Sequence, residues 1–163
     1  MTFLLMLVDS FVFSSFCAIL STENNINSPT SMNKSKLAII EDDVAIAAMY
    51  EFKLQNDGYH VRRADNGQSG LLLLEEFRPD LILLDIKMPI MSGDEMLEKL
   101  RSTEWGSSMR VIVLTNISRD EAPSGLRLLN VDRYLVKAHH TPKQVVDVVN
   151  EVLHGHRPQT ATA

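Results

Sequence analysis

Carboxylates stand directly after two of the apolar runs in this sequence. One apolar run leads into Glu41, Asp42 and Asp43, and the run LILL (81–84) leads into Asp85. A buried carboxylate costs several kcal/mol unless it is paired or bound to a cation. Asp85 is therefore either a helix cap at the rim of the core or a residue with a chemical role.

Two further apolar runs end on side chains that can bind an anion. Thr115, after RVIVL, supplies a hydroxyl donor, and Lys137, after RYLV, supplies a positive charge. If the fold brings these side chains to the carboxylates, protonation or a cation must relieve the repulsion between the acids. Oxygen ligands around a shallow cleft suit Mg²⁺. Such a pocket suits phosphoryl transfer to Asp85, a carboxylate nucleophile that would form an acyl phosphate.

The chain from residue 36 onward alternates between two periodicities. Short aliphatic runs typical of buried strands alternate with longer segments whose apolar residues recur at helical spacing. The predicted strands are 36–40, 59–64, 81–84, 110–115 and 133–137. The predicted helices are 44–58, 67–77, 93–102, 118–130 and 141–153.

Strict alternation of strands and helices indicates an α/β fold, a parallel sheet covered by helices on both faces. Right-handed crossovers favour the flavodoxin-like, doubly wound arrangement. This is a three-layer α/β/α sandwich with five strands in the order 2-1-3-4-5 and five helices. In that order the first, third, fourth and fifth strands are neighbours. The side chains at their carboxyl ends should therefore converge in one pocket.

Two of the predicted helices carry more detailed expectations. The residues expected to face the core from the first helix, at i, i+3, i+4 and i+7, are Ala45, Ala48, Met49 and Phe52. The fourth predicted helix, 118–130, contains Pro123 and Gly125 and should be weak, because both residues disfavour a helix interior.

Composition is that of a soluble globular domain. Of 163 residues, 45% are hydrophobic and 23% are charged. The net charge of −5 argues against a nucleic-acid-binding surface, which needs a basic patch. Cys17 is the only cysteine, so no disulfide framework or paired-cysteine site is predicted, and a reducing, cytoplasmic location is expected.

Residues 1–31 differ from the rest of the chain. The first twenty are mostly apolar, but Asp9 interrupts them. A signal peptide would require a Lys or Arg before the apolar run, and none is present. Because Met32 opens a segment just before the first strand, we interpret residues 1–31 as an upstream extension from a misassigned start. The alternatives are a signal peptide or membrane anchor, and a segment that packs as part of the domain. The domain is predicted at 34–154, and 155–163 is predicted to be a disordered tail.

Residues 34–154 resemble the receiver domain of bacterial two-component response regulators. The residues that carry the resemblance are Glu41, Asp42, Asp85 within LLDIKMPIMSG, Pro89, Gly93, Thr115, Tyr134 and Lys137. The resemblance implies a phosphorylation-dependent signalling switch. Its only catalysis would be the phosphorylation and dephosphorylation of its own aspartate.

The resemblance also implies a role for each acidic residue. Asp85 would be the phosphoacceptor. Glu41 and Asp42 would bind Mg²⁺, or Mn²⁺ as a substitute, together with Asp85 and the backbone carbonyl of Lys87. Asp43 would be the next residue of the loop and not a ligand.

The remaining motif residues would respond to the phosphoryl group. Lys137 matches the phosphate-binding lysine, and Thr115 matches the switch hydroxyl. Tyr134 matches the aromatic residue that changes rotamer when the threonine moves toward the phosphoryl group.

The partners implied are proteins. A sensor histidine kinase or a histidine phosphotransfer protein would donate the phosphoryl group, and an unidentified downstream protein would receive the signal. No nucleic acid or membrane is expected to bind the domain. Only a short segment follows the last helix, so a stand-alone receiver acting by protein contact or phosphorelay is expected.

Two other function classes compete with this interpretation. One is a receiver-like interaction module that is never phosphorylated. The other is an aspartate-nucleophile phosphatase of the dehalogenase type, which needs a second acid two residues after the nucleophile. Lys87 occupies that position and excludes it.

Besides the weak fourth helix, three positions depart from the family pattern. Ala138 stands where the family usually has a proline after the lysine. Because a non-proline cis peptide costs about 2.5–4 kcal/mol, this peptide is expected to be trans, with a small shift of Lys137. Asn130 and Val131 replace the usual Gly-Ala, and Asn130 can still adopt the left-handed conformation.

Overall fold

Five parallel strands form a single sheet in the order β2-β1-β3-β4-β5. The structure is a computed structural model that describes residues 35–155. The strands are β1 (Lys36–Ile40), β2 (His60–Ala64), β3 (Leu81–Leu84), β4 (Arg110–Thr115) and β5 (Arg133–Val136). The helices in this range are α1 (Val44–Asn56), α2 (Gly67–Phe77), α3 (Gly93–Arg101) and α4 (Pro142–His154). The 3₁₀ turns are η1 (Ser124–Leu128) and η2 (Lys137–His139).

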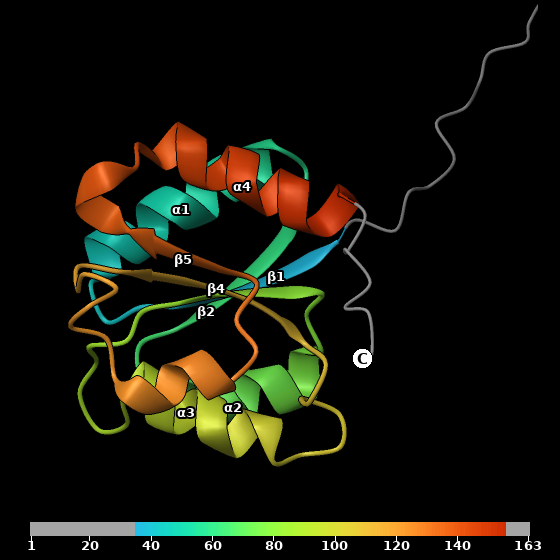
Figure 1. The fold of residues 1–163 in the computed structure, drawn as a ribbon. Helices are drawn as coiled ribbons and strands as arrows, with labels where there is room; N and C mark the ends of the chain where they lie inside the picture. The colour runs from blue at the N-terminus through green and yellow to red at the C-terminus, as the bar shows by residue number, and fades with distance from the viewer. Residues whose placement is uncertain (1–34, 156–163) are drawn as a thin grey trace, which may run out of the picture. The chain divides into compact units, whose positions relative to one another are not determined.

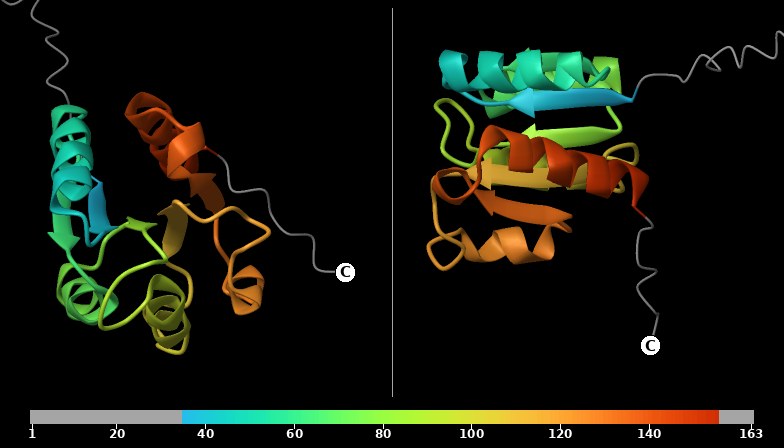
Figure 2. Two further views of the ribbon diagram at one scale, coloured as in Figure 1. Left: turned by 90° about the vertical axis from the view of Figure 1, so that its left-hand side faces the viewer. Right: turned by 90° about the horizontal axis from the view of Figure 1, so that it is seen from above.

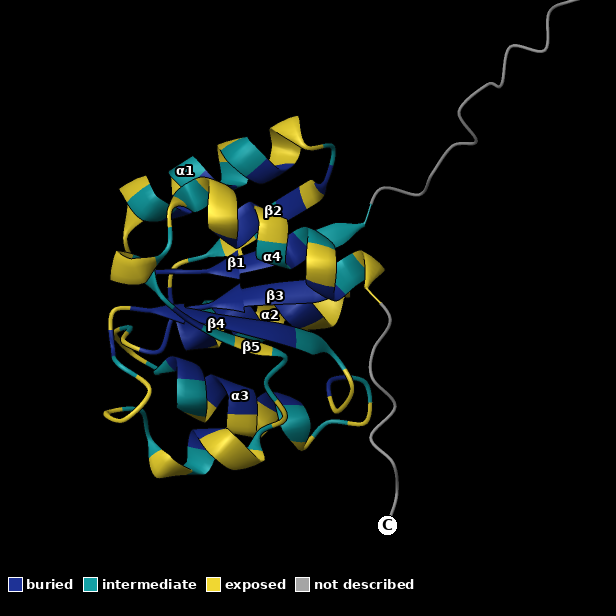
Figure 3. Cartoon of the chain, turned by 45° about the horizontal axis from the view of Figure 1, so that its top comes forward, coloured by how far each residue is buried: buried dark blue, intermediate teal, exposed yellow. Residues whose placement is uncertain are grey.

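Helices cover both faces of the sheet. α1 and α4 lie on one face, and α2, α3 and η1 lie on the other (Figures 1 and 2). The central strands are buried from both sides (Figure 3), which explains their unbroken aliphatic sequences. The predicted flavodoxin-like α/β fold and strand order are confirmed.

The fourth predicted helix is the main difference in secondary structure. Instead of a helix over 118–130, the chain forms only η1, so the described residues contain four α-helices and not five. Pro123 immediately precedes η1 and cannot donate a backbone hydrogen bond, and Gly125 within it has low helix propensity. The prediction of five helices was therefore wrong at this position.

The buried face of α1 also differs from the prediction. Its buried residues are Ala47, Tyr50 and Leu54, at i, i+3 and i+7. Ala45, Ala48 and Phe52 of the predicted stripe are exposed, and only Met49 is half-buried. Apolar residues surround most of this helix, so several faces fit the helical period equally well. Contact with the sheet selects the face that carries Tyr50.

Two of the predicted segments lie wholly or mainly outside the described residues. These are the extension 1–31 and the tail 155–163, of which only Gly155 is described. None of the helices in the described range combines the length and the hydropathy that a bilayer crossing requires.

Ile90, in the loop between β3 and α3, has an unfavourable backbone conformation. Its φ is 69°, a region that β-branched residues rarely adopt, and 78% of its surface is exposed. We expect Ile90→Asn to raise the free energy of unfolding by about 1 kcal/mol, because asparagine tolerates this conformation and little packing is lost. Urea denaturation measures the change. Ile90→Val, which keeps the β-branch, should leave stability unchanged, and an equal gain in both variants would contradict the explanation.

Candidate functional site

The carboxyl ends of β1, β3, β4 and β5 meet at one edge of the sheet. Glu41 follows β1, and Asp85 follows β3, its backbone N–H donating to the Ile40 carbonyl at 2.9 Å. Thr115 is the last residue of β4, and Lys137 follows β5 as the first residue of η2. A cavity of about 220 Å³ lies here. It is lined by Glu41, Asp42, Asp43, Ile46, Asp85, Lys87, Thr115, Asn116 and Lys137.

Lys137 joins two buried carboxylates. Its Nζ lies 2.5 Å from Asp85 Oδ2 and 2.6 Å from Glu41 Oε2. The three side chains are only 9%, 7% and 5% exposed, for Lys137, Asp85 and Glu41 respectively. Burial of this kind is tolerated only when charges are paired, so the bridge neutralises part of the pocket.

The surroundings shift the proton affinities of two members of this bridge. Burial raises the pKa of Glu41, and the charge of Asp85 adds to that effect, while Lys137 opposes it. Burial alone would lower the pKa of Lys137, but its hydrogen bonds to Asp85 and Glu41 outweigh burial and raise that pKa. The lysine is thereby held in its charged form.

Asp85 is fixed by the backbone as well as by Lys137. Its Oδ1 accepts hydrogen bonds from the N–H groups of Ile86, at 2.6 Å, and Lys87, at 3.2 Å. These donors orient the carboxylate, and Lys87 itself lines the cavity. The Gly93 N–H donates to the Ile86 carbonyl at 2.9 Å and closes the loop that carries these donors.

Three carboxylates in the pocket could hold a metal ion. One oxygen each from Glu41, Asp42 and Asp85 lies within 4.8 Å of the others. An all-oxygen set in an open cleft fits Mg²⁺, which keeps several waters when it binds. Asp43 has a different role, since its side chain accepts from the Ala45 N–H at 2.8 Å and caps α1.

We expect Mg²⁺ to stabilise the protein through these carboxylates. At a concentration tenfold above its Kd, a ligand that binds only the folded state adds about 1.4 kcal/mol. Asp42→Asn should lose most of this gain, and Asp43→Asn should keep it because asparagine caps a helix as well as aspartate does. Thermal unfolding with increasing MgCl₂ measures the difference. An equal response of both variants would contradict the assignment.

Thr115 lines the pocket, and Tyr134 contacts the loop that follows Thr115. The Thr115 side chain is fully buried, and its hydroxyl has no hydrogen-bond partner within residues 35–155. Buried polar atoms are rarely left unpaired without a reason. The Tyr134 hydroxyl donates to the carbonyl of Ile117, two residues after Thr115, at 2.9 Å. Tyr134 is thus linked to the loop that follows the threonine.

The departures from the family pattern leave the site intact. The described range contains no cis peptide, so the Lys137–Ala138 peptide is trans as predicted. Lys137 contacts Asp85 in this arrangement, with 2.5 Å between Nζ and Oδ2. Asn130 adopts the left-handed conformation with φ of 51°, which confirms that expectation.

Ile46 and Asn116 line the cavity but are not among the predicted site residues. Asn116 directly follows Thr115, so its position at a strand end was a usable signal. Ile46 lies in the first turn of α1. It was not predicted because the buried face expected for that helix was wrong.

Comparison with known proteins gives one consistent result. A profile of the family described as the response regulator receiver domain matches residues 37–150. The transcriptional regulatory protein AfsQ1 of Streptomyces coelicolor is 39% identical over 102 residues, covering 62% of this chain and 44% of the relative. The phosphate regulon transcriptional regulatory protein PhoB of Rhizobium meliloti is 31% identical over 115 residues, covering 69% of this chain and 50% of the relative. The chain thus spans about half the length of these relatives.

Solved structures agree on the fold and match over nearly their whole length. The chemotaxis response regulator CheY4 of Vibrio cholerae superposes with a TM-score of 0.68 at 26% identity, covering 74% of this chain and 99% of that one. A CheY-like receiver domain protein from Methanospirillum hungatei gives a TM-score of 0.67 at 30% identity, covering 74% and 94%.

Proposed function

Because the chain belongs to the family of response regulator receiver domains, we propose that Asp85 is the phosphoacceptor of this phosphorylation-dependent signalling switch. The observation that carries the proposal is the convergence at Asp85. Its carboxylate lies 2.5 Å from the Lys137 ammonium and beside the carboxylates of Glu41 and Asp42. The Thr115 hydroxyl, which has no hydrogen-bond partner in the described part of the chain, lines the same cavity.

The chemistry we propose is transfer from a phosphohistidine of a sensor kinase or a histidine phosphotransfer protein. An Asp85 oxygen forms a bond to phosphorus as the bond between phosphorus and the imidazole nitrogen breaks, and the electron pair leaves with the imidazole. Lys137 stabilises the negative charge on the phosphoryl oxygens, since it already contacts the accepting carboxylate. Glu41, Asp42, Asp85 and the Lys87 carbonyl would hold Mg²⁺ or Mn²⁺, which neutralises phosphoryl charge when bound.

The response we propose passes through Thr115 and Tyr134. A phosphoryl oxygen on Asp85 offers the buried Thr115 hydroxyl the acceptor that no residue in 35–155 provides. Movement of Thr115 shifts the loop at Ile117, to which the Tyr134 hydroxyl is bonded. Phosphorylation would thus change the balance between two arrangements of the surface around β5.

We further propose that the receiver domain acts in the cytoplasm through protein contact or phosphorelay, without binding nucleic acid itself. The net charge of −5 supports this proposal, because it is unfavourable for contact with a phosphate backbone. The downstream target is expected to be a protein.

A phosphoryl analogue separates this function from that of an interaction module that is never phosphorylated. We expect beryllofluoride with Mg²⁺ to shift the backbone amide resonances of Thr115, Ile117 and Tyr134 in NMR spectra. Mg²⁺ alone should affect mainly the residues beside Glu41 and Asp42. If beryllofluoride adds nothing to the effect of Mg²⁺, the unphosphorylated module is favoured.

A further inference from the structure

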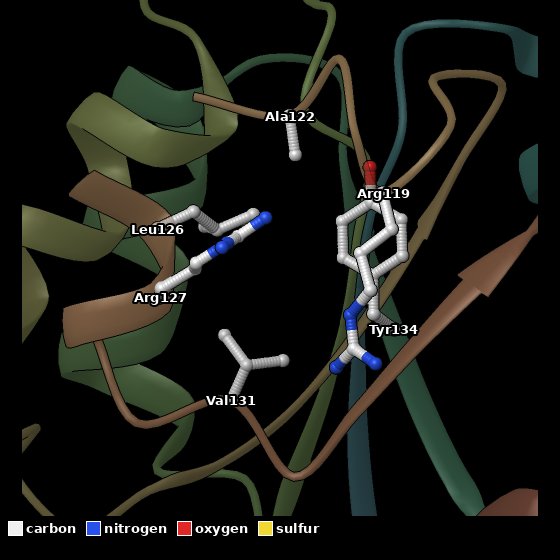
Figure 4. Close-up of a pocket in the computed structure, with 6 residues that line it drawn as sticks. All are labelled: Arg119, Ala122, Leu126, Arg127, Val131 and Tyr134. Atoms are coloured by element: carbon white, nitrogen blue, oxygen red, sulfur yellow. The ribbon is translucent and has the colours of Figure 1, made fainter. Parts of the chain in front are cut away.

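A second cavity, of about 440 Å³, lies between η1 and β5, away from the acidic pocket. It is lined by Arg119, Ala122, Leu126, Arg127, Val131 and Tyr134. In Figure 4 the Arg127 side chain enters from η1, while Arg119 and the Tyr134 ring lie on the opposite side. η1 stands where the sequence predicts a longer helix.

The two arginines of this cavity differ from every other arginine between residues 35 and 155. The other six donate hydrogen bonds or form ion pairs, and they are Arg62, Arg63, Arg78, Arg101, Arg110 and Arg133. Within the same range neither Arg119 nor Arg127 has a hydrogen bond or an ion pair. The neighbouring Glu121 is bonded instead to the Ser118 hydroxyl, at 2.8 Å. Two guanidinium groups that lack a hydrogen bond or ion pair within residues 35–155 therefore line one hollow.

The walls of the cavity between the two arginines are apolar, and hydrogen bonds hold them in place. The Tyr134 ring forms one side, with the Arg119 guanidinium 5.9 Å from its centroid, and its hydroxyl is bonded to Ile117. Leu126 is buried and Val131 half-buried on the other side. Arg101 donates to the Leu129 and Asn130 carbonyls, at 2.8 and 2.9 Å, and so fixes the segment that follows η1.

We propose that this cavity binds a small anion with a flat apolar body, such as an aromatic carboxylate, sulfonate or phosphate. The guanidinium groups supply donors to the anionic group, and the body packs between Tyr134 and the aliphatic side chains. The volume lies in the range of small-molecule sites, about 300–1,000 Å³. The proposal does not depend on phosphorylation of Asp85.

The test uses naphthalene-2-sulfonate, which carries a fixed charge and cannot donate a phosphoryl group. We expect the full chain to bind it with one-to-one stoichiometry and a Kd of about 1 mM or below, as a ligand of this size can reach. Arg127→Gln and Arg119→Gln should each weaken binding about tenfold, since each removes charge-assisted hydrogen bonds. Arg62→Gln, which alters an arginine paired with Glu76 elsewhere, should have no effect. Calorimetry measures affinity, and NMR shifts at Ala122 and Val131 locate the site.

Several results would overturn the proposal. One is the absence of saturable binding of naphthalene-2-sulfonate, and another is an unchanged affinity in Arg127→Gln. A third is equal binding of sulfate alone, which would show that the arginines attract any anion and that the apolar walls do not contribute. Binding that disappears in Asp85→Asn would place the anion in the acidic pocket instead. If the cavity takes up an acidic peptide but not the aryl sulfonate, it is a protein-docking surface and not a small-molecule site.

Discussion

The Asp85→Asn protein is expected to form no phosphoryl adduct with acetyl phosphate and Mg²⁺, while the unaltered protein forms one. The amide oxygen of asparagine carries no negative charge and is not a competent nucleophile toward phosphorus. The substitution preserves shape and can keep the hydrogen bond from the Ile86 N–H, and Lys137 retains Glu41 as a partner. Intact-protein mass spectrometry, with hydroxylamine to cleave acyl phosphates, measures the adduct.

Asp43→Asn is the matched control, because Asp43 lines the same cavity and serves as the cap of α1. It should retain the adduct at the level of the unaltered protein. An adduct that persists in Asp85→Asn, and is cleaved by hydroxylamine, would show that another carboxylate accepts the phosphoryl group. Loss of the adduct in both variants would point to a disturbed pocket and not to the loss of the nucleophile.

The sheet and the acidic pocket could be predicted from sequence because both depend on short, local signals. Unbroken aliphatic runs such as 81–84 identify strands that are buried on both faces. A parallel sheet then places the carboxyl end of every strand at the same edge. Polar residues at the ends of neighbouring strands therefore lie close together, independently of how the helices pack. The bridge between Lys137, Glu41 and Asp85 is a direct consequence of this geometry.

The helices carried weaker information. In α1 an apolar residue occurs on nearly every side, so spacing alone does not select the face with Ala47, Tyr50 and Leu54. That choice is made by the sheet surface against which the helix packs, and the sequence of the helix does not contain it. By contrast, the apolar residues of α4 are confined to one side of the helix, and Val145, Val149 and Val152 among them are buried.

The cavity beside β5 lies beyond sequence-based reasoning for a related reason. Pro123 and Gly125 indicate that a helix is weak, but not what fills the space when it fails to form. Only the folded chain shows that Arg119 and Arg127 face the same hollow with no hydrogen bond or ion pair among residues 35–155. Such arginines are recognised only when the hydrogen bonds and ion pairs of each arginine are known, and these depend on the folded structure.

Gly93→Ala is expected to be the most destabilising single-methyl change in the loop that carries Asp85. A Cβ at this position would lie 2.0 Å from the Asp85 carbonyl oxygen and 3.0 Å from the Ile86 Cα. Both atoms belong to the backbone and cannot rotate away, so the loop itself must move. We expect the free energy of unfolding to fall by about 3 kcal/mol, as for severe overpacking. Urea denaturation measures the loss, and the yield of the Asp85 adduct should fall with it.

Gly125→Ala provides the comparison that separates this clash from a general cost of replacing glycine. Around Gly125 the nearest atom to a new Cβ is Glu98 Oε1 at 3.5 Å, an ordinary contact with a flexible side chain. Its effect should stay within about 0.5 kcal/mol of zero, or be stabilising, because alanine restricts the unfolded chain. If Gly93→Ala were equally mild, the loop would be able to move, and a fixed backbone around Asp85 could not be what orients the carboxylate toward Lys137.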